Sequence, residues 1–163
     1  MATTSPVLRF VRVANVLTKT LLRAGINLSG LGHPTYLLTV RGRKSGEPRT
    51  TPVSVVEQVG KRYLFAPYGV VDWVRNLRAA GAATLTRGRR AEEIRATELP
   101  NDEASCVLKA FIATRNPMGR FFGVTVDSSD AEFARAASSH PVFLLQSVTS
   151  PIAEAARHAR PVR

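Results

Sequence analysis

The order of strand-like and helix-like segments restricts the fold of this chain more than any other feature of its sequence. Short apolar runs bounded by turn-forming residues predict strands, and they lie at residues 35–40, 50–58, 62–67, 83–87, 91–99 and 141–148. Helical patterns are inserted only after the third run, at 72–80, and after the fifth run, from Asn101. Doubly wound parallel sheets alternate strands with helices throughout. The order therefore favours an α+β protein built on a small, mostly antiparallel barrel.

The helix expected at 72–80 has signals at both ends. Asp72 is expected to cap its N-terminus, and Gly81 is expected to end it. The residues expected to face inward are Trp73, Val74, Leu77 and Ala80. The remaining pattern is less decisive, because the glutamates and alanines of 91–99 suit a helix as well as a strand. We expect a loop at 116–123 and a further helical turn at 130–138.

The N-terminal residues 6–24 predict an amphipathic, basic helix. Its apolar positions include Phe10, Leu17 and Leu21, and its cations are Arg9, Arg12, Lys19 and Arg23. Such a helix either packs on the core of its own domain or lies on an anionic membrane surface, and the pattern alone does not separate the two. We expect residues 1–150 to form one domain that includes this helix, and 151–163 to form a tail.

Net charge and amino-acid composition restrict the kinds of partner that this protein can bind. The 163 residues include 23 Lys and Arg against 12 Asp and Glu, a net charge of +11 that indicates an anionic partner. Nucleic acid is disfavoured as that partner, because aromatic residues make up only 7% and do not interleave with the basic loop. A single cysteine, Cys106, allows neither a disulfide within the chain nor a cysteine-based metal cluster. We expect a cytoplasmic protein that holds no metal.

The densest cluster of basic residues is the segment RGRKSGEPR, residues 41–49, between the first two predicted strands. Its glycines permit a close backbone approach, Ser45 and the amides can donate hydrogen bonds, and the cations supply charge. These are the ingredients of a phosphate-binding loop, although the residue order is not that of a Walker loop. From composition alone, a solvated basic hairpin explains the segment equally well.

Trp73 and Asn76 form a second candidate pair, because residues three apart share one side of a helix. The tryptophan could contact a flat ring and the amide its polar atoms, although a lone tryptophan is more often part of a core. The three histidines are scattered, and no nucleophile motif or metal-ligand spacing is present. A cofactor that carries its own chemistry would remove the need for such motifs.

Three segments together resemble a known family. LLTVRGRKSGEPRTTPV, then FAPYG, then DWVRNLRAAG are similar to the deazaflavin-dependent nitroreductase family of flavin/deazaflavin oxidoreductases. The resemblance implies a split β-barrel (FMN-binding-like) that binds coenzyme F420, an 8-hydroxy-5-deazaflavin, and transfers a hydride from its reduced form to a quinone, enone or nitro-aromatic. Related groups bind FMN or haem on the same barrel, so FMN is the alternative cofactor. A non-catalytic cofactor- or nucleic-acid-binding module is the alternative function.

The resemblance also implies a set of site residues. Those expected around the anionic coenzyme tail are Arg43, Lys44, Ser45, Gly46, Arg49, Thr51 and Pro52. Those expected beside the deazaflavin ring and on the closing helix are Pro67, Tyr68, Gly69, Trp73, Asn76 and Leu77. Tyr68 is the candidate proton donor, since the tyrosines that well-known members carry before the last strand are replaced near Val126, Ser129 and Glu132.

The expected partners follow from this assignment. The main partner is a small-molecule hydride acceptor. A homodimer is consistent with the sequence, and residues 6–24 would supply any peripheral contact with the inner face of the cell membrane.

Overall fold

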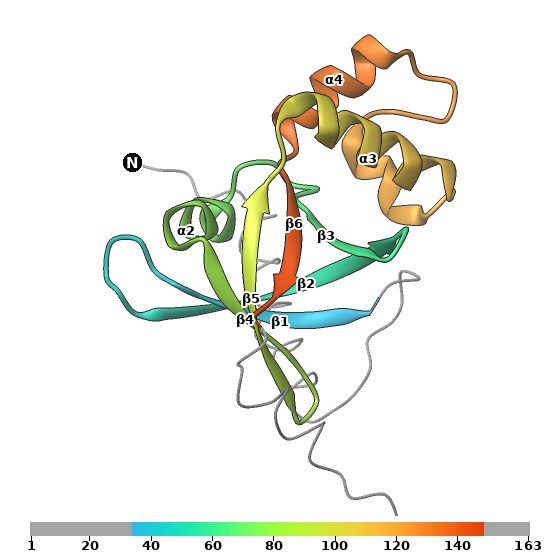
Figure 1. Ribbon diagram of the computed structural model, residues 1–163. Helices are drawn as coiled ribbons and strands as arrows, with labels where there is room; N and C mark the ends of the chain where they lie inside the picture. Colours follow the sequence, from blue (N-terminus) through green and yellow to red (C-terminus); the bar gives the residue numbers. More distant parts are fainter. Residues whose placement is uncertain (1–33, 149–163) are drawn as a thin grey trace, which may run out of the picture.

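The computed structural model describes residues 34–148, which form a closed six-stranded antiparallel barrel with flanking helices (Figure 1). The strands are β1 Thr35–Arg41, β2 Pro48–Gln58, β3 Lys61–Phe65, β4 Ala82–Arg87, β5 Arg90–Glu98 and β6 Val142–Ser147. Around the barrel they follow the order β1-β2-β3-β6-β5-β4. The helices are α2 Asp72–Ala80, α3 Asn101–Ala113, the 3-10 helix η1 Pro117–Phe122 and α4 Asp130–Ser139. The expected α+β barrel fold is confirmed.

Most of the predicted segments are present, and the ambiguous run at 91–99 is a strand. Three details of the prediction are wrong. Residues 117–122 form a 3-10 helix rather than a loop, because Phe122 packs in the core beneath it. Val71 is the N-cap of α2, and Asp72 lies in the first turn, where its carboxylate accepts hydrogen bonds from Arg43 and Arg75 instead of capping the helix.

The third wrong detail is the inward face of α2. Ala80 is exposed, and the buried residues are Val74, Asn76 and Leu77. A polar side chain can occupy this position because Asn76 accepts hydrogen bonds from Arg43. The predictions for residues 6–24 and 151–163 lie outside the described residues.

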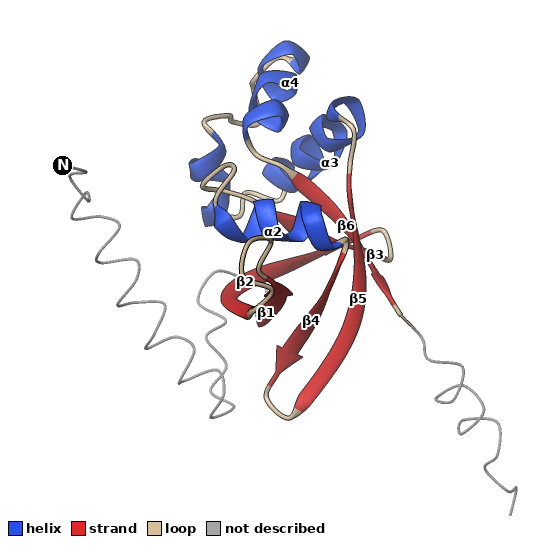
Figure 2. Ribbon diagram, turned by 90° about the vertical axis from the view of Figure 1, so that its left-hand side faces the viewer, coloured by secondary structure: helices blue, strands red, loops and turns tan. Residues whose placement is uncertain are grey.

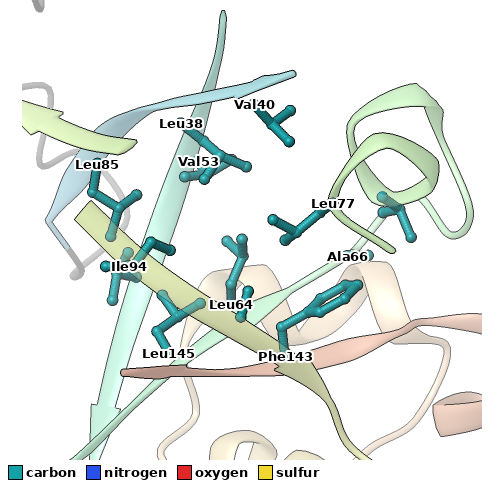
Figure 3. Packing of buried hydrophobic residues seen from close by; sticks show 13 residues of the cluster. Leu38, Val40, Val53, Leu64, Ala66, Leu77, Leu85, Ile94, Phe143 and Leu145 are labelled. Atoms are coloured by element: carbon teal, nitrogen blue, oxygen red, sulfur yellow. The ribbon is translucent and has the colours of Figure 1, made fainter. Parts of the chain in front are cut away.

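Alternation along the strands produces two separate hydrophobic cores. One fills the barrel, where side chains such as Leu38, Leu64 and Phe143 point toward one another (Figure 3). The other lies outside the barrel, between the outer face of β2, β3 and β6 and the helices α3, η1 and α4. Phe65 of β3 stacks there on Phe111 of α3, with ring centroids 4.8 Å apart. The second core fixes the position of the α3–α4 segment relative to the barrel.

One end of the barrel interior is occupied by a charged cluster. Arg62 is paired with Leu145, and Glu92 with Leu85, so their side chains point to the same inner face as these buried leucines. Two hydrogen bonds of 2.7 Å join the Arg62 guanidinium to the Glu92 carboxylate, and Ser147 bonds to both residues. The hydrogen bonds from Arg62 lower the pKa of Glu92. The cluster therefore joins β3, β5 and β6 at this end.

The opposite end of the barrel carries the loop 42–47, which joins β1 to β2. Helix α2 lies beside this loop and across the mouth of the barrel (Figure 2). Gly81, with φ of 65°, ends α2 as predicted, and its amide bonds to the Leu77 carbonyl at 2.8 Å. The loop and the helix come from segments about thirty residues apart, and the barrel brings them together.

Candidate functional site

The loop 42–47 has a conformation that requires its two glycines. Gly46 adopts a φ of 71°, in the left-handed region. Gly42 is buried, and a Cβ there would lie 3.0 Å from Ser45 Oγ and 3.1 Å from the Glu47 carbonyl oxygen. Backbone hydrogen bonds of 2.8 Å from Gly42 to Glu47 and from Gly46 to Gly42 close the turn. The glycines therefore give the basic loop one tight backbone shape.

Arg43 attaches this loop to α2. Its backbone amide and its Nη1 both donate to Asn76 Oδ1, at 3.2 and 2.9 Å. Its guanidinium also lies 3.3 Å from the Asp72 carboxylate. Sequence reasoning placed Arg43 among the cofactor-binding cations, but its side chain is already engaged within the protein. The structure thus gives Arg43 a role in holding the loop.

Lys44 and Arg49 have a different environment. Both are exposed, and neither side chain forms an ion pair with another residue of 34–148. Both line a cleft of about 700 Å³ between the loop and α2. The cleft is lined by Gly42, Arg43, Lys44, Ser45, Pro48, Arg49, Thr50, Thr51, Asp72, Trp73 and Asn76. Two cations on one cleft that form no ion pair with another residue of 34–148 are suited to an anionic ligand.

Asn76 contributes a hydrogen-bond donor to the same cleft. Only 5% of the residue is exposed, and both hydrogen bonds from Arg43 end on its Oδ1. That pairing identifies the other atom as the amide Nδ2, which has no acceptor among the described residues. The amide is therefore suited to an oxygen atom of a ligand.

Trp73 forms an aromatic wall of the cleft. It is half-buried, and its ring lies 6.1 Å from Phe143 of the barrel core. The core interpretation of Trp73 is confirmed in part, since the ring packs on the barrel core, and its contact with a flat ring stays a prediction. Leu77, one turn further along α2, is completely buried in that core. Leu77 supports the helix from below and does not reach the cleft surface.

The other predicted site residues do not line the cleft. Pro52 is paired with Leu37 on β1, and Gly46 lines a neighbouring hollow of about 440 Å³ beside β4. Pro67, Tyr68 and Gly69 form the turn between β3 and α2. Tyr68 is 68% exposed and lies edge-on to Phe121 of η1, with ring centroids 5.4 Å apart. Phe121 was not identified from the sequence, because it belongs to no motif there.

Val126, Ser129 and Glu132 stand near the positions where well-known family members carry tyrosines, and the structure shows what each of them does instead. Val126 is 46% exposed. Ser129 is the N-cap of α4 and forms a capping box with Glu132, whose backbone amide and carboxylate both bond to it. The hydrogen bond from the Ser129 amide lowers the pKa of Glu132. These two side chains are committed to the start of the helix and are not arranged as proton donors.

Neither a membrane-spanning helix nor a cluster of metal ligands is found among the described residues. None of its helices is long and apolar enough to cross a membrane. Within residues 34–148, no group of three His, Cys, Asp or Glu side chains is placed to hold a metal ion.

The structural similarity to two of the three solved chains described next, those with TM-scores of 0.51 and 0.50, supports the fold. A chain described as a domain-swapped dimer is 25% identical, with a TM-score of 0.51 over 87% of this chain and 100% of that one. The heme storage protein HutZ from Vibrio cholerae is 14% identical, with a TM-score of 0.50 over 71% and 82% of the two chains. The F420-H2 dependent reductase FDR-A is 22% identical over 69% and 93%, with a TM-score of 0.46.

Comparison of sequences identifies the family. Curated proteins offer no match to this chain. The model of the family described as F420H(2)-dependent quinone reductase matches residues 11–118. This match covers more than half of the 163 residues, including the basic loop and all of α2. The chain therefore belongs to the F420H2-dependent quinone reductase family, whose members are deazaflavin-dependent oxidoreductases that use coenzyme F420.

Proposed function

We propose that the cleft between loop 42–47 and α2 binds the anionic tail of coenzyme F420, and that the protein delivers a hydride from the reduced coenzyme to a conjugated acceptor such as a quinone, an enone or a nitro-aromatic. One observation carries the proposal: Lys44 and Arg49, two cations that form no ion pair with another residue of 34–148, share a cleft with Trp73 and with the Asn76 side-chain amide. The family assignment supplies the chemical class of the ligand.

The chemistry of the cleft fits this ligand. A phosphodiester and glutamate carboxylates present several anionic oxygens, which charge-assisted donors bind more strongly than neutral ones. The volume of about 700 Å³ lies within the range of about 300–1,000 Å³ that is common for cofactor sites. Trp73 adds an apolar wall, and the Ser45 and Thr51 hydroxyls add neutral donors. FMN also has an anionic tail, so the cleft alone does not select between the two cofactors.

The cations in and beside the loop have two different proposed roles: Arg43 holds the loop in place, and Lys44 and Arg49 bind the ligand. Arg43 holds the loop against Asn76 and Asp72 before any ligand arrives. This arrangement leaves Lys44 and Arg49 presented from a fixed backbone, which lowers the entropy lost when a ligand binds. Tight binding of the tail then positions the rest of the coenzyme along α2 toward the turn 67–69.

The reaction needs little acid–base or nucleophilic chemistry from the chain. The deazaflavin supplies a hydride, and the protein supplies orientation and electrostatic stabilisation. Tyr68 lies exposed on the turn that precedes α2, and its phenol can donate a proton to an acceptor oxygen. In the proposed mechanism that proton comes from Tyr68 or from water. The alternative of a non-catalytic or nucleic-acid-binding module is not favoured, because the family match is to reductases.

The direct test is a fluorescence titration of the purified protein with oxidised F420, beside an identical titration with FMN. We expect saturable F420 binding at micromolar concentration and weaker FMN binding. Absence of F420 binding in this range would contradict the proposal, and preferential FMN binding would replace the cofactor. Turnover of reduced F420 with a quinone, an enone and a nitro-aromatic then identifies the acceptor class.

A homodimer and a membrane contact complete the proposal. The dimer is supported by the 25% identical chain described as a domain-swapped dimer, and light scattering after size exclusion would measure its mass. The proposed membrane contact is through residues 6–24, outside the described residues. Sedimentation with anionic vesicles, before and after deletion of 1–24, would test that contact. Unchanged sedimentation would contradict it.

A further inference from the structure

An aromatic surface beside the cofactor cleft is not explained by tail binding. Tyr68 is 68% exposed although it is a large aromatic residue. Phe121 meets it edge-to-face, with ring centroids 5.4 Å apart. The guanidinium carbon of Arg120 lies 4.9 Å from the centroid of the Phe121 ring. We call these three residues the aromatic shelf.

The shelf is assembled from two distant segments and its backbone is fixed. Tyr68 follows β3, whereas Arg120 and Phe121 belong to η1, which the outer core holds against the barrel through Phe122. The Ala66 amide bonds to the Pro141 carbonyl at 3.0 Å, and the Ala66 carbonyl is 3.2 Å from His140 Nδ1. The backbone amide and the backbone carbonyl of Ala66 are thus both hydrogen-bonded, which fixes the start of the turn.

Gly69 restricts the same turn further. Its φ is 70°, and a Cβ there would lie 3.1 Å from the Ser139 carbonyl oxygen. Its amide bonds back to the Ala66 carbonyl at 2.9 Å. The turn is therefore packed against the end of α4, and Tyr68 projects from a rigid base. A rigid, exposed aromatic surface can bind a flat ring with little loss of conformational entropy.

The shelf lies close to the cofactor cleft along the chain. Only three residues separate Tyr68 from Asp72, which lines the cleft. Four residue steps span at most about 14 Å even when fully extended, and the turn shortens this span. Tyr68 and the cleft residue Asp72 therefore lie within about 14 Å of each other, on either side of the N-terminus of α2.

We propose that the aromatic shelf is the acceptor subsite and that it selects planar aromatic-type acceptors over aliphatic enones. The inference rests on the proposed function. An acceptor ring stacks against Tyr68 and Phe121, and the Arg120 guanidinium, which has no ion pair with another described residue, donates to a carbonyl or nitro oxygen of that ring. Phe121 and Arg120 act on acceptor choice and make no contact in the coenzyme cleft.

The test compares a two-ring naphthoquinone with cyclohexenone as acceptors for wild type and Phe121→Ala. Loss of one stacking partner is expected to raise KM for the naphthoquinone about five- to tenfold, with kcat and F420 affinity unchanged. KM for cyclohexenone should change less than twofold. Val126→Ala is the matched control, because it removes an exposed apolar side chain from the same α3–α4 connection. Equal KM shifts for the two acceptors, or no shift, would overturn the inference.

Two further measurements keep the test independent of folding and of the coenzyme. Arg120→Gln alters only an exposed side chain, so the barrel should fold, and it should raise KM for the naphthoquinone several-fold. Quenching of Trp73, the single tryptophan, by naphthoquinone without coenzyme should weaken in both variants. If F420 fails to bind the wild type, the proposed function fails. Unaltered quenching in both variants would overturn the shelf.

Discussion

The two ends of the barrel carry similar cations in opposite arrangements. At the far end, Arg62 is bound by Glu92 and Ser147, and the cluster joins three strands. At the cleft end, Lys44 and Arg49 have no ion-pair partner among residues 34–148, while Arg43 keeps their loop in place. Paired charges there contribute to the fold, whereas unpaired charges on a fixed loop contribute to binding. Arginine content alone does not distinguish these roles.

The strongest test of this contrast removes the unpaired cations. Lys44→Ala combined with Arg49→Ala should weaken F420 binding roughly a hundredfold, because each charge-assisted hydrogen bond contributes on the order of 1.5–3 kcal/mol. The melting temperature should change little, because both substitutions remove exposed side chains that belong to neither hydrophobic core. Fluorescence titration and thermal unfolding measure the two quantities.

A charge-matched control lies at the other end. Lys61→Ala combined with Arg89→Ala also removes two exposed cations, one at the start of β3 and one in the β4–β5 turn. F420 affinity should stay within about twofold of wild type if local geometry, rather than overall charge, binds the coenzyme. Equal losses in the two double variants would show that long-range charge is sufficient, and the site assignment would be withdrawn.

The next test loosens the loop without removing a cation. Asn76→Ala deletes the acceptor of two hydrogen bonds from Arg43 and leaves those donors without it. The free energy of unfolding should fall by about 1–3 kcal/mol, and F420 affinity should fall roughly tenfold, because the loop loses its fixed shape and the ligand loses the Asn76 amide donor. Urea unfolding and the same titration measure both effects.

Arg78→Ala provides the control on the same helix. Arg78 forms hydrogen bonds of 2.6 and 2.7 Å with Glu98, but its side chain is 41% exposed and faces away from the cleft residues. Its loss should lower stability by less than about 1 kcal/mol and leave F420 affinity unchanged. If Asn76→Ala behaves like Arg78→Ala, the attachment through Asn76 does not prepare the site.

Local patterns predicted the fold, and tertiary contacts decided the details of the site. Alternation and Gly or Pro boundaries are local signals, so the order of strands and helices could be derived from the sequence. The loop motif and the spacing of Trp73 and Asn76 likewise identified residues that meet in one cleft. The engagement of Arg43 could not be derived, because its partner Asn76 is 33 positions away.

The dependence on partners distant in sequence also explains why the contact of Phe121 and the role of Asp72 were not predicted. Phe121 carries no pattern of its own, and it meets Tyr68 only because the outer core orients η1. Asp72 has the side chain of a helix cap, yet Arg43 and Arg75 bind its carboxylate in the folded protein. Residue type gives the capacity for an interaction, and the choice between competing partners depends on the fold.

The smallest expected effect concerns the paired end and depends on pH. Hydrogen bonds from Arg62 lower the pKa of Glu92 below its ordinary value of 4.5. The unfolded chain therefore takes up this proton more readily than the folded one, so the Glu92 contribution is complete above about pH 4.5 and is lost as the pH falls through the lowered folded pKa. Glu92→Gln should reduce stability by less than about 1 kcal/mol at pH 7, because both side chains are partly exposed.

Urea unfolding of wild type and Glu92→Gln at pH 7, 5 and 3 measures this dependence. The two proteins should differ at pH 7 and 5, and the difference should shrink as the pH falls below 4.5 toward the lowered folded pKa of Glu92. F420 affinity at pH 7 should be the same in both, since the cluster lies at the end of the barrel opposite the cleft. A stability difference that persists unchanged to low pH would mean that packing, rather than the ion pair, holds β3, β5 and β6 together there. Altered F420 affinity would show instead that the two ends of the barrel are coupled.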